Sequence, residues 1–315
     1  MMLQRILPLA LLIAILGGAP ALAGYKEGQA AYQKGETAAA LKEFMALAQA
    51  GNADAQVMVG QILMNGGKGV ARDTKAGMQW VRRAAEGGNL DAQVFLAQAL
   101  LNGWHGEAKD PPSAAKWFER AAKAGDPRAM MPFAQMKLQG VGTEKDPAAA
   151  VPYLEKLAAA GNANANEMLG TMALQGSGME KDPVKAGRHL TQAARTGDDS
   201  STFILGQMYL KGVGVEKDTE LGLRLITQSA NAGNFQAMLN LAMILANGSD
   251  DVSQDSQQAY RWITIVLNRA PQGELFYGAS GIETTLRSRL SSRQIEAAQA
   301  EASRFMATPI KPAVR

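Results

Sequence analysis

Small and apolar residues recur along the chain at helical spacing, and the whole pattern repeats about every 36 residues. The first copy carries Ala55, Val59, Gly60 and Leu63, which share one face if this segment is a helix. One slot holds only glycine or alanine in all six copies: Gly60, Ala97, Ala134, Gly170, Gly206 and Ala242. Residues this small let a second helix approach closely. Self-similarity at this period predicts a helical solenoid, in which neighbouring copies bury each other's apolar faces.

A glycine followed by Asn or Asp marks where each copy begins. The pairs are Gly51-Asn52, Gly88-Asn89, Gly125-Asp126, Gly161-Asn162, Gly197-Asp198 and Gly233-Asn234. The glycine suits the left-handed residue after a helix, and the Asn or Asp suits the N-cap of the next helix. The spacing is 37 residues in the first two copies and 36 afterwards. The extra residue falls in the turn inside the copy, where the second copy has Gly103-Trp104-His105-Gly106 and the third only Gly140-Val141-Gly142.

An aspartate predicts the start of a second helix in every copy. The six are Asp73, Asp110, Asp146, Asp182, Asp218 and Asp255. Three of them directly precede a proline, which is favoured at the first helical position after an N-cap. The seventh residue after each aspartate is mostly large: Trp80, Trp117, Tyr153, His189, Leu225 and Trp262. Small residues such as Ala84 and Ala85 follow, so we expect large and small side chains to interlock between stacked helices.

The first 23 residues have the organisation of a secretory signal peptide. Arg5 precedes an apolar run over residues 6–16, which only Pro8 interrupts, and Ala21-Leu22-Ala23 has the small-x-small pattern of a cleavage site. The run is shorter than the roughly 20 residues that span a bilayer. We therefore expect cleavage after Ala23, a periplasmic or secreted protein, and no stable membrane insertion of the mature chain. A retained anchor is the alternative.

Composition removes several other classes. The chain has 315 residues and no cysteine, which excludes disulfides, cysteine-rich metal sites and a lipid anchor on cysteine. The formal charge of +3 is too small to indicate a nucleic-acid-binding protein. Stability is therefore expected to come from apolar packing between the copies.

These residues resemble the Sel1-like repeat family, a relative of the tetratricopeptide repeats. The matching residues of the first copy are Gly51-Asn52, Ala55-Gln56, Gly60, Gly69-Val70, Asp73, Lys75-Ala76, Trp80 and Ala84-Ala85. The resemblance implies an all-α fold, a right-handed α-α superhelix (solenoid) of helix–turn–helix repeats. It also implies an adaptor or scaffold, since exported members are associated with signalling, envelope assembly, polysaccharide regulation and host contact.

We expect the chain to have four parts. Residues 1–23 are the signal peptide, 24–50 a shortened leading helical unit and 51–270 the solenoid. Residues 271–315 are expected to hold a capping helix over Leu290 to Phe305, with a capping box of Ser291 and Gln294, and a disordered tail from Ala307. The sixth copy has a polar stretch, residues 249–258, in place of the glycine turn, and is expected to be a degenerate cap.

Candidate catalytic residues are few. His189 occupies the large slot of its helix and is interpreted as a packed residue, while His105 lies in the enlarged turn beside Trp104. Two isolated histidines make a poor zinc site. The glycine turns recur with the repeat and lack the phosphate-binding Gly-x-x-x-x-Gly-Lys-Ser/Thr pattern, and the acidic residues of the sixth copy lack the spacing of a calcium loop. We therefore predict no enzymatic activity, no metal and no cofactor.

The first helix of each copy should line the concave surface, as in tetratricopeptide arrays. Counted from its alanine, residues at −1, +2, +6, +9 and +10 then face a groove. Amides at +6 and +10 and apolar residues at +2 suit an extended peptide. The predicted partner-binding residues are Val57, Gln61, Asn65, Gln98, Asn102, Met131, Gln135, Gln139, Glu167, Thr171, Phe203, Gln207 and Lys211. The alternative is that the amides are ordinary solvated residues and the +2 residues pack between repeats.

The leading functional hypothesis is an exported scaffold that binds a protein or peptide through its concave face and regulates envelope signalling or assembly. The alternative is a protein that binds or processes a cell-envelope glycan, either peptidoglycan or a polysaccharide. Trp104 and the acidic sixth copy are the only support for this alternative.

Overall fold

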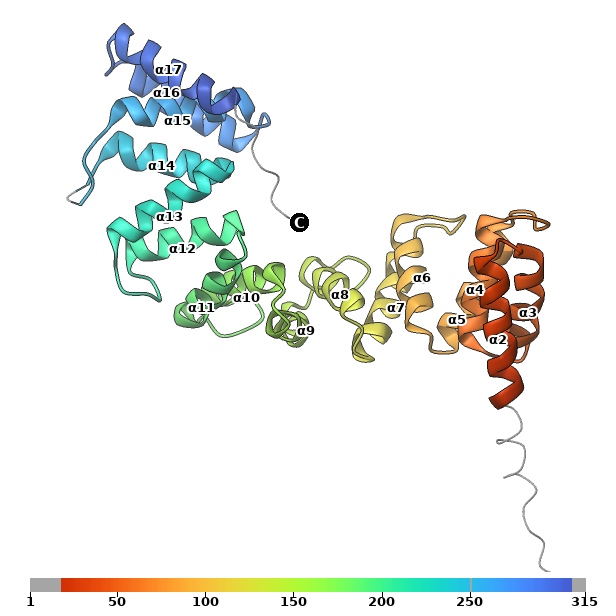
Figure 1. Ribbon diagram of the computed structural model, residues 1–315. Helices are drawn as coiled ribbons and strands as arrows, with labels where there is room; N and C mark the ends of the chain where they lie inside the picture. Colours follow the sequence, from red (N-terminus) through yellow and green to blue (C-terminus); the bar gives the residue numbers. More distant parts are fainter. Residues whose placement is uncertain (1–17, 250, 308–315) are drawn as a thin grey trace, which may run out of the picture. The chain divides into compact units, whose positions relative to one another are not determined.

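The computed structural model describes residues 18–249 and 251–307, and the regular structure within them is helical (Figure 1). The earlier helices are α2 (Gly18–Gln33), α3 (Thr37–Gln49), α4 (Ala53–Asn65), α5 (Thr74–Glu86), α6 (Leu90–Asn102), α7 (Pro111–Lys123) and α8 (Pro127–Gln139). The later ones are α9 (Pro147–Ala159), α10 (Ala163–Gln175), α11 (Pro183–Arg195), α12 (Asp199–Lys211), α13 (Thr219–Ala232), α14 (Phe235–Asn247), α15 (Ser256–Arg269), α16 (Glu274–Arg287) and α17 (Ser292–Ala307). The predicted all-α helical-repeat fold is confirmed.

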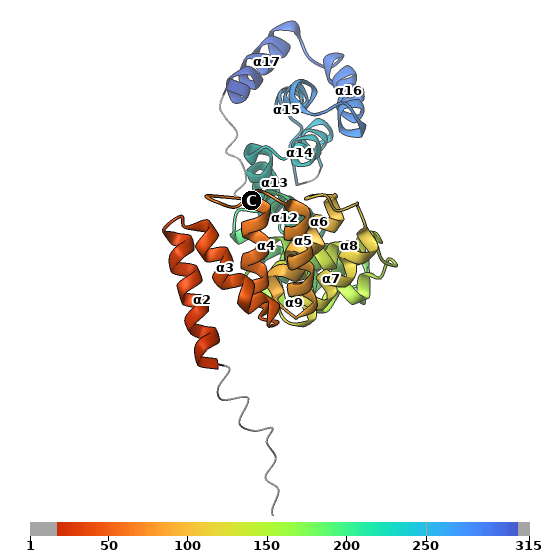
Figure 2. The ribbon, with the colours of Figure 1, turned by 90° about the vertical axis from the view of Figure 1, so that its right-hand side faces the viewer.

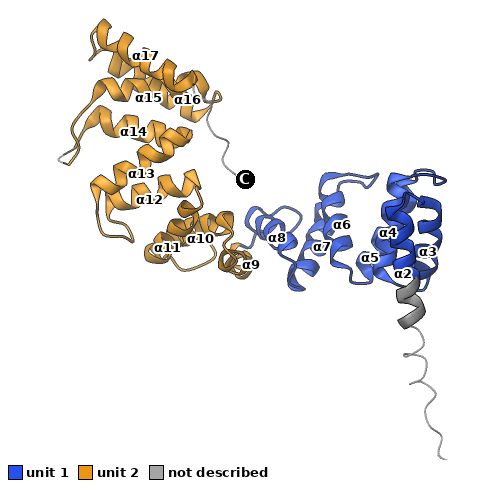
Figure 3. Cartoon of the chain, viewed as in Figure 1, with its two compact units in different colours: residues 1–146 blue, residues 147–315 orange. Residues whose placement is uncertain are grey.

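The chain divides into two compact units, residues 1–146 and 147–315 (Figure 3). In the first unit α2 packs on α3, α4 on α5 and α6 on α7, and α3, α5 and α7 each pack on the first helix of the next pair. In the second unit α9 packs on α10, and the pairs α10/α11, α12/α13 and α14/α15 follow the same rule. Residues 24–50 thus belong to a helix pair, α2 and α3, which stacks directly on α4.

Two predictions concern the ends of the chain. Residues 1–17, which are most of the expected signal peptide, and residues 308–315, nearly all of the expected tail, lie outside the described residues. The expected cleavage point after Ala23 falls inside α2, which continues to Gln33. Export and cleavage therefore stay predictions.

The aspartates expected to start the second helices form hydrogen bonds to both helices that flank the turn. Asp218 Oδ1 accepts a hydrogen bond from Leu221 N at 2.9 Å, which caps α13. Its own backbone N–H donates to Tyr209 O at 3.0 Å, in the last turn of α12. The same cap is made by Asp73, Asp110, Asp182 and Asp255. One residue therefore satisfies orphan polar groups at the end of one helix and at the start of the next.

The glycine-or-alanine slot lies where the two helices of a repeat touch. A Cβ at Gly206 of α12 would lie 2.9 Å from Gly222 O of α13 and 2.8 Å from the Ile226 side chain. Gly60 and Gly77 make the same approach between α4 and α5. The restriction to small residues seen in the sequence thus reflects backbone-to-backbone contact within a repeat.

A second close approach links one repeat to the next. The glycine turns of the third, fourth and fifth repeats each lie on the proline that begins the second helix of the preceding repeat. The pairs are Gly142 on Pro111, Gly178 on Pro147 and Gly214 on Pro183. A Cβ at Gly214 would lie only 2.1 Å from Pro183 O. We call these three pairs the turn–proline contacts.

The sixth repeat is more regular than its sequence indicates. Ser249 N donates to Val252 O at 2.8 Å and Val252 N donates back to Ser249 O at 3.1 Å. Gly67 and Val70 form the same pair of bonds in the first repeat, both at 2.9 Å. The polar stretch therefore builds a turn of the first repeat's kind, and the sixth repeat is a full helix pair, not a degenerate one.

One helix, α16, is not predicted from the sequence. Gly278 and Gly281 lower its intrinsic helix propensity and obscure its periodicity. Tertiary packing outweighs this cost, because Ala279 and Leu286 are fully buried in the core of the second unit. Figure 2 shows α15 with α16 on one side and α17 on the other, and α15 packs on both.

The expected closing helix is α17, and its capping box is confirmed. Ser291 N donates to Gln294 Oε1 at 3.0 Å, and Gln294 N donates to Ser291 Oγ at 3.4 Å. The apolar side of α17 packs on α15, where Phe305 meets Trp262 edge to face at 5.5 Å between ring centroids. The last two helices together cover the apolar side that the sixth repeat would otherwise expose.

Candidate partner-binding surface

In the first unit the amide slots of the first helices are exposed on α4, α6 and α8. They hold Gln61, Asn65, Gln98, Asn102, Gln135 and Gln139, which we call the amide row. The two amides of each helix are four residues apart, which places them on one face. Asn102 Nδ2 donates to Gln98 O at 2.9 Å. The other five side chains make no hydrogen bond to any described residue, so their donors and acceptors are open to a ligand.

In the second unit the same slots are more mixed. Lys211 is exposed, whereas Thr171 and Gln207 are half-buried. In the sixth repeat Met243 is 44% exposed and Asn247 is exposed. This face therefore offers a cation and one apolar side chain besides its amides.

The surface of the second unit is hollowed around Met243 and Asn247. Both residues line a pocket of about 500 Å³ between the turns after α12 and α14, and a smaller one of about 210 Å³. Ile282 and Arg289, from α16 and the residues after it, form the far wall of the smaller pocket. These positions are absent from the predicted partner-binding residues because the sixth repeat is expected from sequence to be a cap and α16 is not predicted. The indication in the sequence is that Met243 lies at +6 from Ala237, the slot that the amides occupy in other repeats.

The residues at +2 are predicted either to contact a partner or to pack between repeats, and they differ in burial. Val57 and Met131 are half-buried at the edge of the surface. Phe203 is only 8% exposed and belongs to the same core as Ile226 and Met238. Phe203 is therefore a packing residue, and its prediction as a partner contact is corrected.

Glu167 is half-buried at the equivalent slot of α10. Burial, and secondarily the charge of Asp198, raise the pKa of its carboxyl group. The same two causes raise the pKa of the Asp199 carboxyl group. This part of the surface is acidic and partly desolvated, and it suits a cationic partner group better than an apolar one.

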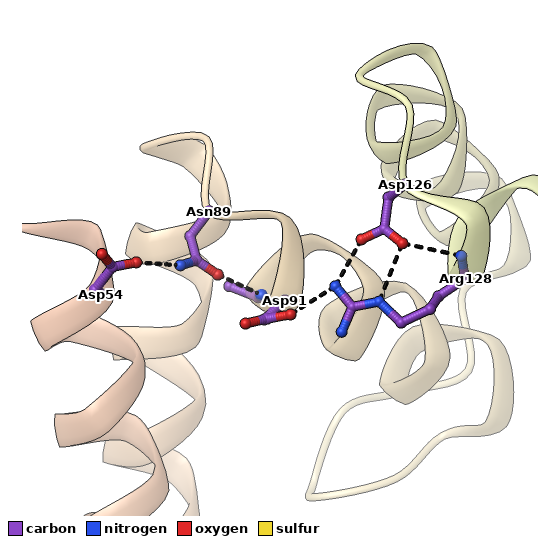
Figure 4. Close-up of polar contacts among 6 residues, drawn as sticks. Asp54, Asn89, Asp91, Asp126 and Arg128 are labelled. Carbon is purple, nitrogen blue, oxygen red and sulfur yellow. Dashed lines mark hydrogen bonds and ion pairs between the residues drawn. The ribbon is translucent and has the colours of Figure 1, made fainter.

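The side chains at the −1 slots, at the amino-terminal edge of the first helices, bond to a neighbouring repeat (Figure 4). Asn89, the N-cap of α6, donates from Nδ2 to Asp54 Oδ1 at 2.7 Å. Arg128 Nη2 lies 2.5 Å from Asp91 Oδ1 and 2.6 Å from Asp126 Oδ2. These side chains therefore link α4, α6 and α8 and are engaged within the protein, unlike the amide row.

We expect Arg128→Ala to destabilise the first unit by about 1 kcal/mol at pH 7. The Asp126 side chain is 3% exposed, and its hydrogen bond with Arg128 holds the pKa of its carboxyl group below the usual range. A carboxyl group whose pKa is lowered by folding stabilises the protein at pH values above its unfolded pKa of about 4. This stabilisation is lost as the pH falls through the pKa of the folded state. Urea unfolding at pH 7 and pH 3 should therefore show that the difference in the free energy of unfolding between Arg128→Ala and wild type is smaller at pH 3.

The matched control is Lys42→Ala, because Lys42 is exposed and makes no ion pair with a described residue. This variant should match wild type at both pH values. A constant difference between Arg128→Ala and wild type from pH 7 to pH 3 would contradict the role assigned to Asp126.

The two histidines lie in different repeats. His189 is half-buried with Nδ1 3.0 Å from Asn166 Oδ1, and burial lowers the pKa of its imidazole. His105 is exposed and its ring lies 5.1 Å from that of Phe95. Across residues 18–249 and 251–307, no group of three His, Asp or Glu side chains is placed to hold a metal ion. None of the helices described here is long and apolar enough to cross a membrane.

Comparisons with known proteins agree with the geometry. The Sel1 repeat family model matches residues 53–89, 90–126, 129–162, 163–198, 200–234 and 235–264. The crystal structure of a Sel1 repeat protein from Oxalobacter formigenes is 31% identical over 76% of this chain and 96% of that chain, with a TM-score of 0.50. A protective antigen of uropathogenic Escherichia coli with an SLR fold is 21% identical over 93% of this chain and 78% of that chain, with a TM-score of 0.39. A putative Sel1 repeat protein from Klebsiella pneumoniae is 22% identical over 65% and 98%, with a TM-score of 0.35. No curated protein matches significantly.

Proposed function

The chain belongs to the Sel1 repeat family, and from this premise we propose that it is a scaffold that binds a protein or peptide through the first helices of its repeats. The observation that carries the proposal is the amide row. All six side chains are exposed and five of them bond to no described residue, and they recur on the first helices of three successive repeats. An amide side chain has both a donor and an acceptor, so a row of them matches the polar groups of an extended backbone.

The first helices of the second unit provide places for side chains. Met243 is a flexible apolar side chain, and it lies between two pockets that Asn247 also lines. Lys211 and Glu167 add one charge of each sign to the same set of helices. Each unit by itself therefore suits a peptide or an extended segment of a protein, the first through amides that can bond a backbone and the second through pockets that can take side chains.

Photocrosslinking tests the proposed face. A photoreactive residue at Gln98 of the amide row should capture the partner in cells that make the protein. The same residue at Lys116, which is exposed on α7 of the same repeat, should not. The triple variant Gln61→Ala, Gln98→Ala and Gln135→Ala should weaken binding of the captured partner at least about tenfold. Equal crosslinking from both positions, or unchanged binding by the triple variant, would refute the proposal.

We propose further that the scaffold acts outside the cytoplasm, in envelope signalling or assembly. The support is the organisation of residues 1–23 as a signal peptide. Cleavage after Ala23 would retain Tyr25, whose ring meets Phe44 edge to face at 5.3 Å. Amino-terminal sequencing of the protein from cell fractions should find Gly24 first in an extracytoplasmic fraction. An intact amino terminus in the cytoplasm would contradict export.

Binding of an envelope glycan is the second candidate. Trp104 is 55% exposed, and exposed tryptophans provide stacking surfaces for sugar rings. The acidic sixth repeat no longer supports it, because Asp251 is paired with Lys217 at 2.7 Å. Saturable binding of peptidoglycan fragments that Trp104→Ala abolishes would favour the glycan function, and a flat titration would exclude it.

A further inference from the structure

We propose that the first unit carries a second binding site, separate from the amide row, for an acidic peptide segment of a protein. The site is a pocket of about 740 Å³ between α5 and the enlarged turn that joins α6 to α7. Its lining is mainly polar and comes from two repeats. Its polar residues are Arg72, Thr74, Lys75, Gln79 and Arg82 from the first, and His105 and Glu107 from the second.

The pocket exists because a turn–proline contact is missing at this place. Gly106 is the counterpart of Gly142, which lies against Pro111. A Cβ at Gly142 would be 2.2 Å from Pro111 O, whereas a Cβ at Gly106 would meet nothing within 4 Å. The enlarged turn therefore stands away from Thr74, the first residue of α5, and leaves the space open.

The turn is held in this open position by contacts of its side chains with α5 and α6. Arg82 Nη2 of α5 lies 2.9 Å from Glu107 Oε2, which fixes the distance between the two walls. His105 adopts a left-handed backbone conformation, with φ of 56°, and its ring lies on Phe95 of α6. Such a conformation is unfavourable for a residue other than glycine and persists where the surroundings hold it. The pocket is thus a built feature of the turn.

The charge of the lining selects the ligand. Arg82 and Glu107 neutralise one another. Arg72 and Lys75 make no ion pair or hydrogen bond through their side chains within the part of the chain that the structure describes, so two positive charges are uncompensated. A concave site with an excess of one sign attracts ligands of the opposite sign, and an arginine fork matches a carboxylate.

The size of the pocket favours a peptide over a single anion. A volume of about 740 Å³ is in the range of sites that take ligands of several residues. Thr74 and Gln79 provide neutral hydrogen-bonding groups for a backbone. Trp104, in the same turn, presents an exposed aromatic surface. A segment with two or more Asp or Glu residues would satisfy both cations at once.

Fluorescence anisotropy with the full mature chain tests the site. The probe is a labelled dodecapeptide of alternating Glu and Gly, and the neutral probe has Gln in place of Glu. We expect the acidic peptide to bind saturably and the neutral one not to bind. Arg72→Glu with Lys75→Glu should weaken acidic-peptide binding at least about tenfold, and raised salt should weaken it in wild type. Lys42→Glu, which reverses one charge outside the pocket, should bind as wild type does.

A second double variant distinguishes a loss of binding from a loss of folding. Arg72→Gln with Lys75→Gln keeps the polar lining and should also lose binding while its thermal unfolding matches wild type. The triple amide-row variant should bind the acidic peptide normally, so failure of this site and failure of the amide row are distinguishable. Equal binding of the Glu and Gln peptides, equal affinity of the pocket variants and Lys42→Glu, or binding of an oligo-uronate but not of the peptide would each overturn the proposal.

Discussion

Gly214→Ala is expected to destabilise the second unit by about 2–5 kcal/mol, and Gly197→Ala by only about 1–2 kcal/mol. Both glycines have positive φ, 71° at Gly214 and 90° at Gly197. Both variants therefore incur the cost of placing an L-residue in the left-handed region. At Gly197 a Cβ would meet nothing within 4 Å, whereas at Gly214 it would lie 2.1 Å from Pro183 O and 2.3 Å from Pro183 C.

The difference between the two variants isolates the turn–proline contact. The overlapping atoms of Pro183 belong to the backbone at the first turn of α11, so no side chain can rotate away. The turn after α12 must lift off the preceding repeat, which loosens the packing between them. Chemical denaturation of both variants, followed by tryptophan fluorescence and circular dichroism, measures the two losses. Equal losses would show that the contact contributes nothing beyond backbone strain.

Phe44→Ala is expected to lower the free energy of unfolding of the first unit by about 3–5 kcal/mol. Phe44 of α3 is fully buried in a core with Val59 and Ile62 of α4. The packing on its other side is close, because a Cβ at Gly28 of α2 would lie 2.9 Å from the ring. Truncation would leave a cavity among three helices that the surrounding backbone cannot fill.

The result would show whether residues 24–50 are an integral part of the array. The control is Trp104→Ala, which removes a larger side chain that is 55% exposed, and its loss should stay within about 0.5 kcal/mol. Thermal unfolding and limited proteolysis of both variants measure this. If Phe44→Ala unfolds like wild type and only α2 and α3 become protease-sensitive, the leading pair is an appendage, and the expectation is wrong.

Much of the fold is predictable because the same local sequence signals recur in all six repeats. The Gly-Asn pairs, the capping aspartates and the Gly-or-Ala slot all have the roles that their residue types indicate. The failures come where a single copy departs from the rule. The turn at Ser249 contains no internal glycine, yet its hydrogen bonds reproduce those at Gly67. The helix α16 contains two glycines and is stabilised by packing that no local pattern reveals.

The candidate site was predictable in part, because helical spacing determines which side a residue faces but not how closely its neighbours approach. Gln98 and Gln135 are exposed as expected. Phe203 has the equivalent spacing to Val57, yet it is enclosed by the core. The pocket beside α5 depends on the absence of one contact at Gly106. The sequence shows the longer turn and a threonine, Thr74, in place of the proline, but it does not show how far the turn stands from α5.

The turn–proline contacts also determine how such an array can change its length. The glycine of each contact belongs to one repeat and the proline to the repeat before it, and both recur at intervals of 36 residues. A tandem duplication of 36 residues in this region supplies every new glycine with a proline, wherever the duplicated stretch begins. An insertion of any other length within a helix separates a glycine from its proline. We therefore expect evolution to lengthen or shorten this part of the molecule by whole repeats, through unequal recombination, while smaller insertions accumulate in turns such as that of Trp104, where no proline constrains them.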